Sequence, residues 1–203
     1  MKLYYTRGAC SLVVRIIINE IGLRAEFESV DLRSKKTEKG DDFLKINPKG
    51  AVPTLKTNDG EILTENAVIL QYLADTNGAT KLLPGTGDFK RYRVLEWLNY
   101  VATELHKTIS TLFNPGLPEE VREKVYKPLI KTKCTYVDKN LANHNYLLGD
   151  EFTLPDAYLF VMMTWLVHFK FDLNEWPNLQ RYFTELKQRK SIHQSLVEEK
   201  LAD

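Results

Sequence analysis

The sequence predicts a protein in two parts, an α/β domain with a mixed sheet followed by an all-α helical-bundle domain. Over the first 77 residues, short β-prone runs alternate with helical runs. Residues 78–88 are rich in Gly and Pro, which is typical of a linker. From residue 89 to residue 203 the apolar residues recur at helical spacing. We therefore expect domains at 1–77 and 89–203.

The composition of the chain excludes several classes of protein. With 43% hydrophobic and 27% charged residues, its 203 residues suit a soluble globular protein. A formal net charge of +1 gives no bulk attraction to nucleic acid or membrane, and no apolar run has transmembrane length. Two cysteines, Cys10 and Cys134, make no disulfide framework. We expect a cytoplasmic protein with reduced thiols and no nucleic-acid or membrane partner.

The first elements place a cysteine at the start of a helix. We expect a strand over residues 2–6, a turn at Gly8 and an apolar helix over residues 12–21, with Ser11 as a candidate N-cap. Helix N-termini favour anions, so a cysteine at such a position has a lowered pKa and forms the thiolate more readily. The other interpretation of Cys10, a small buried apolar residue, fits this stretch equally well.

The remainder of the first domain predicts a sheet covered by helices. The expected segments are a strand at 25–32, a polar loop at 33–42, a helical turn at 43–46, strands at 51–56 and 61–63 around a turn at 58–60, and a helix at 65–76 capped by Thr64. This order begins with a βαβ unit and ends with a hairpin and a helix. It is the order of a thioredoxin-like domain.

The second domain is expected to be helical throughout. The expected helices are 89–112, 119–143 with Pro128 inside it, 154–169, 177–188 and 192–199. Thr153 and Asp156 have the spacing of a capping box at the start of the third helix, which has no polar face and is therefore a core helix. Three polar residues of the first helix are separated by four and three positions and share one face: Asn99, Thr103 and His106.

Several residues of the first domain together predict a site for a small peptide. A cis bond at Val52-Pro53 would turn the Val52 backbone toward an extended ligand. Glu65 and Asn66 begin a helix, so they can hold an amino group and a carboxylate. Lys35 can reach a second carboxylate. Glutathione has this zwitterionic head, extended middle and second carboxylate, although each residue alone also fits an ordinary structural role.

The strings KLYYTRGACS, NPKGAVPTL, LTENAVILQYLAD, EWLNYVATELHK and TLPDAYLF resemble the bacterial beta-class glutathione transferases, in order and over essentially the whole chain. The resemblance implies a thioredoxin-like domain followed by a helical domain. It implies a detoxifying transferase that uses glutathione as co-substrate without a metal, acts on small electrophiles and forms a homodimer. It also implies that Val52-Pro53 carries the cis-proline.

The resemblance assigns roles to individual residues. Cys10 is implied to be the active-site cysteine, close enough to glutathione to form a mixed disulfide. The implied glutathione-binding residues are Cys10, Lys35, Val52, Pro53, Glu65, Asn66, Asn99, Thr103, Glu104, His106 and Lys107, with Glu104, Lys107 or both reaching across a dimer interface. The candidate catalytic residues are Cys10, His106 as a hydrogen-bond donor or proton carrier, and, in second rank, Tyr5 and Ser11 as thiolate donors.

The chain departs from the usual pattern of this family. Arg7 stands where Pro is usual and adds a cation near Cys10 if its side chain turns inward. Asn66 stands where Ser or Gly is usual, and a Pro-His pair is common where Val14 and Arg15 stand. Asn66 keeps hydrogen-bonding groups, so we expect the pocket for the glutathione head to persist.

Two kinds of chemistry and two alternatives follow. Glutathione is either conjugated to an electrophile or exchanged with a disulfide through Cys10. One alternative is a non-catalytic protein of the same fold that binds the transcription machinery. The other is mainly a glutaredoxin-like reductase, although Val13 stands where a resolving cysteine would be.

Overall fold

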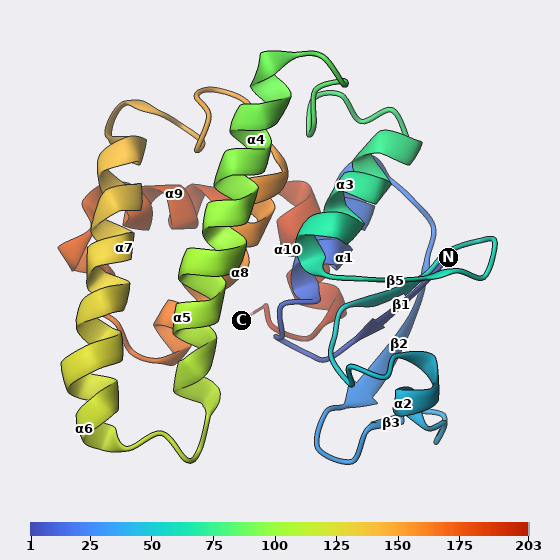
Figure 1. Ribbon diagram of the computed structural model, residues 1–203. Helices are drawn as coiled ribbons and strands as arrows, with labels where there is room; N and C mark the ends of the chain where they lie inside the picture. The colour runs from blue at the N-terminus through green and yellow to red at the C-terminus, as the bar shows by residue number, and fades with distance from the viewer. Residues whose placement is uncertain (203) are drawn as a thin grey trace. The chain divides into compact units, whose positions relative to one another are not determined.

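The computed structural model describes residues 1–202 and divides into two compact units (Figure 1). The first unit comprises Met1–Ala79 together with the residues from Arg189 onward, and the second comprises Thr80–Gln188. The division at 77 and 89 expected from the sequence stays a prediction. The residues from Arg189 onward, which the sequence analysis assigned to the helical domain, group with the first unit. Within residues 1–202, no helix combines the length and apolar character needed to cross a membrane.

The first unit is built on one mixed sheet with the strand order β3-β2-β1-β4-β5. The strands are β1 (Lys2–Tyr5), β2 (Glu26–Asp31), β3 (Lys36–Thr37), β4 (Thr54–Lys56) and β5 (Ile62–Thr64). β1 runs parallel to β2 and antiparallel to β4, so the βαβ unit and the hairpin are confirmed. β3 falls in the polar run that was predicted as a loop. Its two residues are too few for any periodicity to indicate a strand.

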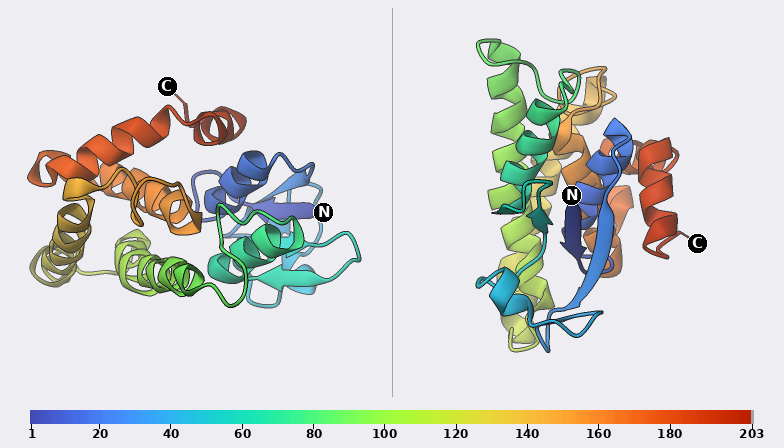
Figure 2. Two further views of the ribbon diagram at one scale, coloured as in Figure 1. Left: turned by 90° about the horizontal axis from the view of Figure 1, so that it is seen from above. Right: turned by 90° about the vertical axis from the view of Figure 1, so that its right-hand side faces the viewer.

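Among the described residues of the first unit, the helices are α1 (Leu12–Ile21), α2 (Phe43–Ile46), α3 (Asn66–Thr76) and α10 (Lys190–Glu198). α1 has the predicted bounds and ends at Gly22, whose φ of 77° suits a glycine. α1 contacts β1, α3 and α10, and Figure 2 shows α10 beside it. Because neighbours cover it on several sides, all residues from Leu12 to Ile18 are buried.

Two expectations for α3 are wrong. Thr64 ends β5 and does not cap the helix; Glu65 is the N-cap residue and makes no capping hydrogen bond. Val68, assigned to the apolar face, is 45% exposed, whereas Ile69, Leu70 and Leu73 are buried. The reason is that the helix buries a face shifted by one position from the predicted one, with Ile69, Leu70, Leu73 and Ala74 buried.

The second unit is helical, as predicted. Its helices are α4 (Phe89–Tyr100), α5 (Lys107–Ser110), α6 (Glu119–Val121), α7 (Lys127–Asn140), α8 (Leu154–His168) and α9 (Pro177–Lys187). A π-helical segment over Val101–His106 connects α4 to α5, and a second over Arg122–Tyr126 connects α6 to α7. The two long predicted helices therefore form, each with a π-helical segment inside. Pro128 lies in the first turn of α7, where its missing N–H is tolerated.

The capping box of α8 is confirmed, and its carboxylate connects three elements of the second unit. Asp156 accepts hydrogen bonds from the Thr153 N–H and hydroxyl, both 2.8 Å, from the Leu147 N–H at 2.9 Å and from the Tyr182 hydroxyl at 2.8 Å. Burial raises the pKa of Asp156, and these donors oppose that rise. The carboxylate thus joins the loop before α8, the start of α8 and α9.

Candidate functional site

The turn that carries Cys10 lies directly before α1 in the first unit. Cys10 is half-buried, and its Sγ donates a hydrogen bond to the Val52 carbonyl over 3.3 Å. The Val52–Pro53 bond is cis, as expected. The cysteine is therefore partly accessible and lies beside the chain that leads into β4, which suits a reactive thiol better than a core residue.

Two polar neighbours of this turn do not act as the sequence suggested. Ser11 is fully buried, makes no capping hydrogen bond and instead exchanges hydrogen bonds with the Thr6 backbone, at 3.2 and 3.3 Å. The Arg7 guanidinium donates to the Lys200 carbonyl, so its side chain is directed to the segment after α10 and not inward to Cys10. Both side chains form structural contacts here.

Tyr5 also has structural contacts. The Arg15 guanidinium carbon lies 4.5 Å from the centre of the Tyr5 ring and 3.7 Å from that of the Phe27 ring. The Tyr5 and Phe27 rings meet edge to face, with centres 6.4 Å apart. These contacts favour packing as the role of Tyr5, which was a second-rank candidate for a thiolate donor.

The start of α3 holds an exposed carboxylate in an unusual backbone conformation. Glu65 has φ of 72°, in the left-handed region that non-glycine residues rarely adopt. Such a conformation costs on the order of 1–3 kcal/mol and persists where surrounding structure enforces it, often at a functional site. Its carboxylate pairs with Lys49 Nζ at 2.6 Å. The sequence analysis missed Lys49, because no spacing relates it to Glu65.

Asn66 and Lys35 complete the predicted set in the first unit. The Asn66 side chain is 6% exposed, and its Oδ1 has no hydrogen-bond partner within residues 1–202. A buried amide oxygen without a partner is costly, so this one is a candidate to accept a ligand's donor. Lys35, whose φ is 56°, donates from Nζ to the Gly50 carbonyl over 2.7 Å, close in sequence to Val52.

The predicted residues of the second unit gather on the first π-helical segment and next to it. Thr103 and Glu104 are exposed, and Thr103 donates to the Asn99 carbonyl at 2.9 Å. His106 is half-buried; its Nδ1 lies 2.5 Å from the Tyr158 hydroxyl and its ring centre 5.1 Å from that of Trp165. The spacing of four and three assumed an α-helix throughout. A π-helical turn changes that register and often marks a functional site.

Glu104 and Lys107 differ in their surroundings. Both are exposed, and Glu104 forms an ion pair with Lys133 of α7. A contact between either residue and a second copy of the chain stays a prediction.

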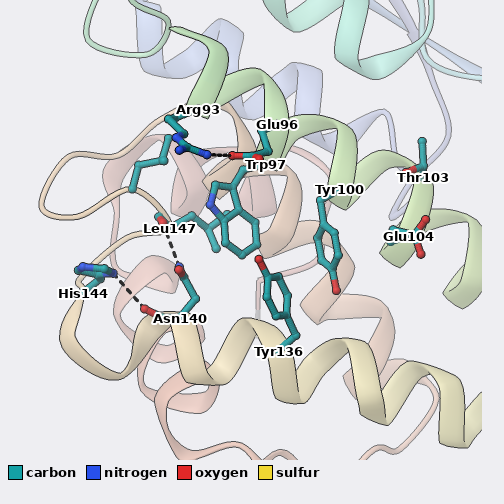
Figure 3. A pocket seen from close by; sticks show the side chains of 11 residues that line it. Arg93, Glu96, Trp97, Tyr100, Thr103, Glu104, Tyr136, Asn140, His144 and Leu147 are labelled. Carbon is teal, nitrogen blue, oxygen red and sulfur yellow. Dashed lines mark hydrogen bonds and ion pairs between the residues drawn. The ribbon is translucent and has the colours of Figure 1, made fainter. Parts of the chain in front are cut away.

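A pocket of about 750 Å³ lies between α4 and α7 of the second unit (Figure 3). Thr103 and Glu104 are at its edge. Three aromatic rings lie together in it, with ring centres 5.6 Å apart for Trp97 and Tyr136 and 5.2 Å apart for Tyr100 and Tyr136. These rings were not among the residues predicted from the sequence. The i, i+3 spacing of Trp97 and Tyr100 would have placed two of its rings on one side of a helix.

The candidate residues thus fall into two sets. The first unit holds Tyr5, Cys10, Ser11, Lys35, Val52, Pro53, Glu65 and Asn66, and the second holds Asn99, Thr103, Glu104, His106 and Lys107. Their assembly into one site stays a prediction. Among residues 1–202, no group of three or more His, Cys, Asp or Glu side chains is placed to hold a metal ion. Cys134 is buried, which raises its pKa to about 12 and makes it an inert thiol.

Comparisons with known proteins identify relatives over the whole chain. A model described as "Glutathione S-transferase, N-terminal domain" matches residues 8–76, and one described as "Glutathione S-transferase, C-terminal domain" matches residues 100–190. Glutathione S-transferase GstA of Escherichia coli O157:H7 is 41% identical over 201 residues, covering 99% of this chain and 100% of that protein.

Solved structures that are similar to this chain include glutathione S-transferases. A bacterial beta-class glutathione S-transferase of Sphingomonas chungbukensis has a TM-score of 0.95 and 39% identity, covering 100% of both chains. A sphingomonad glutathione S-transferase complexed with glutathione has a TM-score of 0.94 and 39% identity, also covering 100% of both chains.

Proposed function

Since this chain belongs to the glutathione S-transferase family, we propose that it conjugates glutathione to small, mostly apolar electrophiles. The observation that carries the proposal is the half-buried Cys10, whose Sγ lies 3.3 Å from the Val52 carbonyl. A glutathione cysteine aligned with the chain at Val52 would place its sulfur near this thiol. Its γ-glutamyl head would then lie toward the start of α3.

The start of α3 suits the glutathione head. Lys49 already presents an ammonium group to the Glu65 carboxylate at 2.6 Å, and the ligand's ammonium group can take its place. The partnerless Oδ1 of Asn66 supplies a further acceptor, and α3, with 11 residues, presents N–H groups to the ligand's carboxylate. Lys35, held at the Gly50 carbonyl, supplies the cation for the glycine carboxylate.

In the conjugation step the glutathione sulfur attacks as a thiolate. A bond forms between this sulfur and the electrophilic carbon, and the bond from that carbon to its leaving group breaks with both electrons; the thiol proton goes to solvent. We assign His106, with Asn99 and Thr103, to the hydrogen bonds that hold the ligand from the second unit. The Tyr158 hydroxyl at 2.5 Å orients the His106 ring.

We also assign Cys10 a thiol–disulfide exchange with glutathione disulfide. The Cys10 thiolate attacks one sulfur, a bond forms between Cys10 and that glutathione, and the other glutathione leaves as a thiolate. The products are a mixed disulfide and one reduced glutathione. No resolving cysteine is needed for this monothiol step.

We further propose that the chain forms a homodimer in the cytoplasm. The second unit exposes three aromatic side chains on α4 and α7: Phe89 at 67%, Tyr92 at 59% and Tyr136 at 54%. Aromatic side chains are enriched in protein–protein interfaces. Analytical ultracentrifugation at micromolar concentration tests this part, and a monomer there would contradict it.

The principal experiment is mass spectrometry of the protein after incubation with glutathione disulfide, together with conjugation of chlorodinitrobenzene. We expect the wild type and Cys134→Ser to gain one glutathione, and Cys10→Ser to gain none. Retention on immobilised glutathione tests binding separately. No adduct, no retention and no conjugation would favour the non-catalytic alternative. Disulfide reduction that persists in Cys10→Ser would show that another group is the nucleophile.

A further inference from the structure

We propose that Glu199 is a positioning residue for Cys10: its carboxylate holds the backbone of the turn Thr6–Cys10 through Gly8. Glu199 directly follows α10 and lies within the first unit, so turn and carboxylate belong to one compact body. The inference rests on the proposed function of Cys10, but the contact itself does not involve glutathione.

The Glu199 carboxylate connects the segments on both sides of Cys10. Its side chain is fully buried. One oxygen accepts from the Gly8 N–H at 2.9 Å, and the other accepts from Arg15 Nε at 3.0 Å. Gly8 lies two residues before Cys10 and Arg15 lies in the first turns of α1. A hydrogen bond to a buried charged group is among the stronger ones in proteins, so this side chain ties the Gly8 end of the turn to α1. The Cys10 end is bonded to α1 by backbone hydrogen bonds from the Leu12 N–H to the Ala9 carbonyl and from the Val13 N–H to the Cys10 carbonyl.

Other contacts of the same segment support this arrangement. Arg7 donates to the Lys200 carbonyl, and a Cβ atom built on Gly8 would lie 3.7 Å from a methyl group of Leu201. Gly8 has φ of 68°, a conformation that glycine adopts without strain. The residues after α10 therefore cover the Gly8 end of the turn.

The position of Cys10 depends on this end of the turn. The turn is closed by a hydrogen bond of 3.0 Å from the Ala9 N–H to the Thr6 carbonyl, and Cys10 follows at once. A displacement of Gly8 is transmitted over two residues to the sulfur, which lies 3.3 Å from the Val52 carbonyl. Since Cys10 is proposed to lie beside the glutathione sulfur, a loosened turn would displace the thiol and weaken its contact with bound glutathione.

The electrostatic surroundings of Glu199 keep its carboxylate in place. The charged groups that act on it are Arg15 of α1 and Glu198 of α10. Burial raises the pKa of Glu199, while Arg15 and the Gly8 N–H oppose the rise. The Arg15 guanidinium is itself fixed against the rings of Tyr5 and Phe27.

Glu198 is a matched control for Glu199. It also pairs with Arg15, at 3.2 Å, but it otherwise accepts hydrogen bonds from Asn19 and Gln194, neither of which belongs to the turn. Replacing either glutamate removes one negative charge from Arg15. Of the two, only Glu199 accepts a hydrogen bond from the Gly8 N–H.

The experiment compares Glu199→Ala and Glu199→Gln with Glu198→Ala and Glu198→Gln. The first readout is the rate of Cys10 alkylation by iodoacetamide without glutathione, followed by mass spectrometry. The second is KM for glutathione and kcat for conjugation. We expect Glu199→Ala to change the alkylation rate at least about threefold and to raise KM about tenfold with a smaller change in kcat. We expect Glu199→Gln, which keeps one oxygen acceptor, to have a smaller effect, and both Glu198 variants to stay within about twofold of wild type.

Equal effects of the Glu199 and Glu198 variants would overturn the proposal, because a general loss of stability or of charge would produce them. Should the Glu199 variants fail to fold, hydrogen exchange of the Gly8 amide in the wild type decides. A protected amide supports the contact, and exchange at the rate of an unstructured peptide refutes it. If the wild type has no activity with glutathione, the proposed function is refuted. If the Glu199 variants still change the rate of Cys10 alkylation in that case, this inference stands.

Discussion

Replacing Asp156 should destabilise the protein more than any other change at the start of α8. The carboxylate divides its contacts equally: Oδ1 accepts from the Leu147 N–H and the Tyr182 hydroxyl, and Oδ2 accepts from the N–H and hydroxyl of Thr153. All four partners are buried. Asp156→Ala therefore removes four hydrogen bonds and leaves two backbone N–H groups without an acceptor.

The expected magnitude follows from these bonds. At a net value of about 1 kcal/mol for each bond, Asp156→Ala should lower the free energy of unfolding by about 4 kcal/mol. Asp156→Asn keeps one oxygen and hence two of the bonds, so it should cost about 2 kcal/mol. Thr153→Ala removes the capping hydroxyl and should cost about 1 kcal/mol. Because the free energy of unfolding of a domain is only about 5–15 kcal/mol, the loss expected for Asp156→Ala is a large share of it.

Urea unfolding at pH 7, followed by circular dichroism and by tryptophan fluorescence, measures the series. Matched transitions by the two probes are the control for two-state behaviour. The reasoning would be refuted if Asp156→Ala cost no more than Thr153→Ala, since the carboxylate would then act only as a cap. An Asp156→Asn variant as stable as wild type would show that neither the negative charge nor the second carboxylate oxygen contributes to the free energy of unfolding.

Three further outcomes are expected. Glu20 is partly buried, and burial raises its pKa. Hydrogen bonds from Arg189 Nε, at 2.9 Å, and from the Ser191 hydroxyl outweigh burial, so the pKa of Glu20 is lowered. The resulting stability is present above the ordinary glutamate pKa of about 4.3 and is lost as pH falls through the lower folded-state pKa. Urea unfolding should accordingly show Glu20→Gln about 1 kcal/mol less stable at pH 7 and equal to wild type in acid; a difference that persists there would contradict this reasoning. Iodoacetamide should label Cys10 in the native protein and Cys134 only after denaturation, as measured by peptide mass spectrometry, because burial raises the Cys134 pKa to about 12; native labelling of Cys134 would exclude this. Glu65→Gln should raise KM for glutathione about tenfold with little change in kcat, since a neutral amide binds an ammonium group less strongly; an unchanged KM would remove Glu65 from the ligand site.

Local sequence predicts elements well where one chemical signal dominates. The bounds of α1 match because a mostly apolar run ends at Gly22, and the capping box at Thr153 and Asp156 depends on neighbours three positions apart. The π-helical segment over Val101–His106 was not predicted, because its residues keep an ordinary amphipathic pattern. A change of hydrogen-bond register within a helix has no residue code of its own.

The sequence by itself determined the βαβ unit, the hairpin, the helical character of the second part, the capping box and the family, through residues that act on near neighbours or occur in recognisable strings. Only the tertiary structure decided where the side chains around Cys10 point. The Arg7 side chain donates to the Lys200 carbonyl, and the Ser11 hydroxyl accepts from the Thr6 N–H. The Gly8 N–H donates to Glu199, which lies 191 positions later in the chain. The physical reason is that each polar group on this turn takes the nearest partner that packing provides, and in two of these three cases the partner comes from the segment after α10.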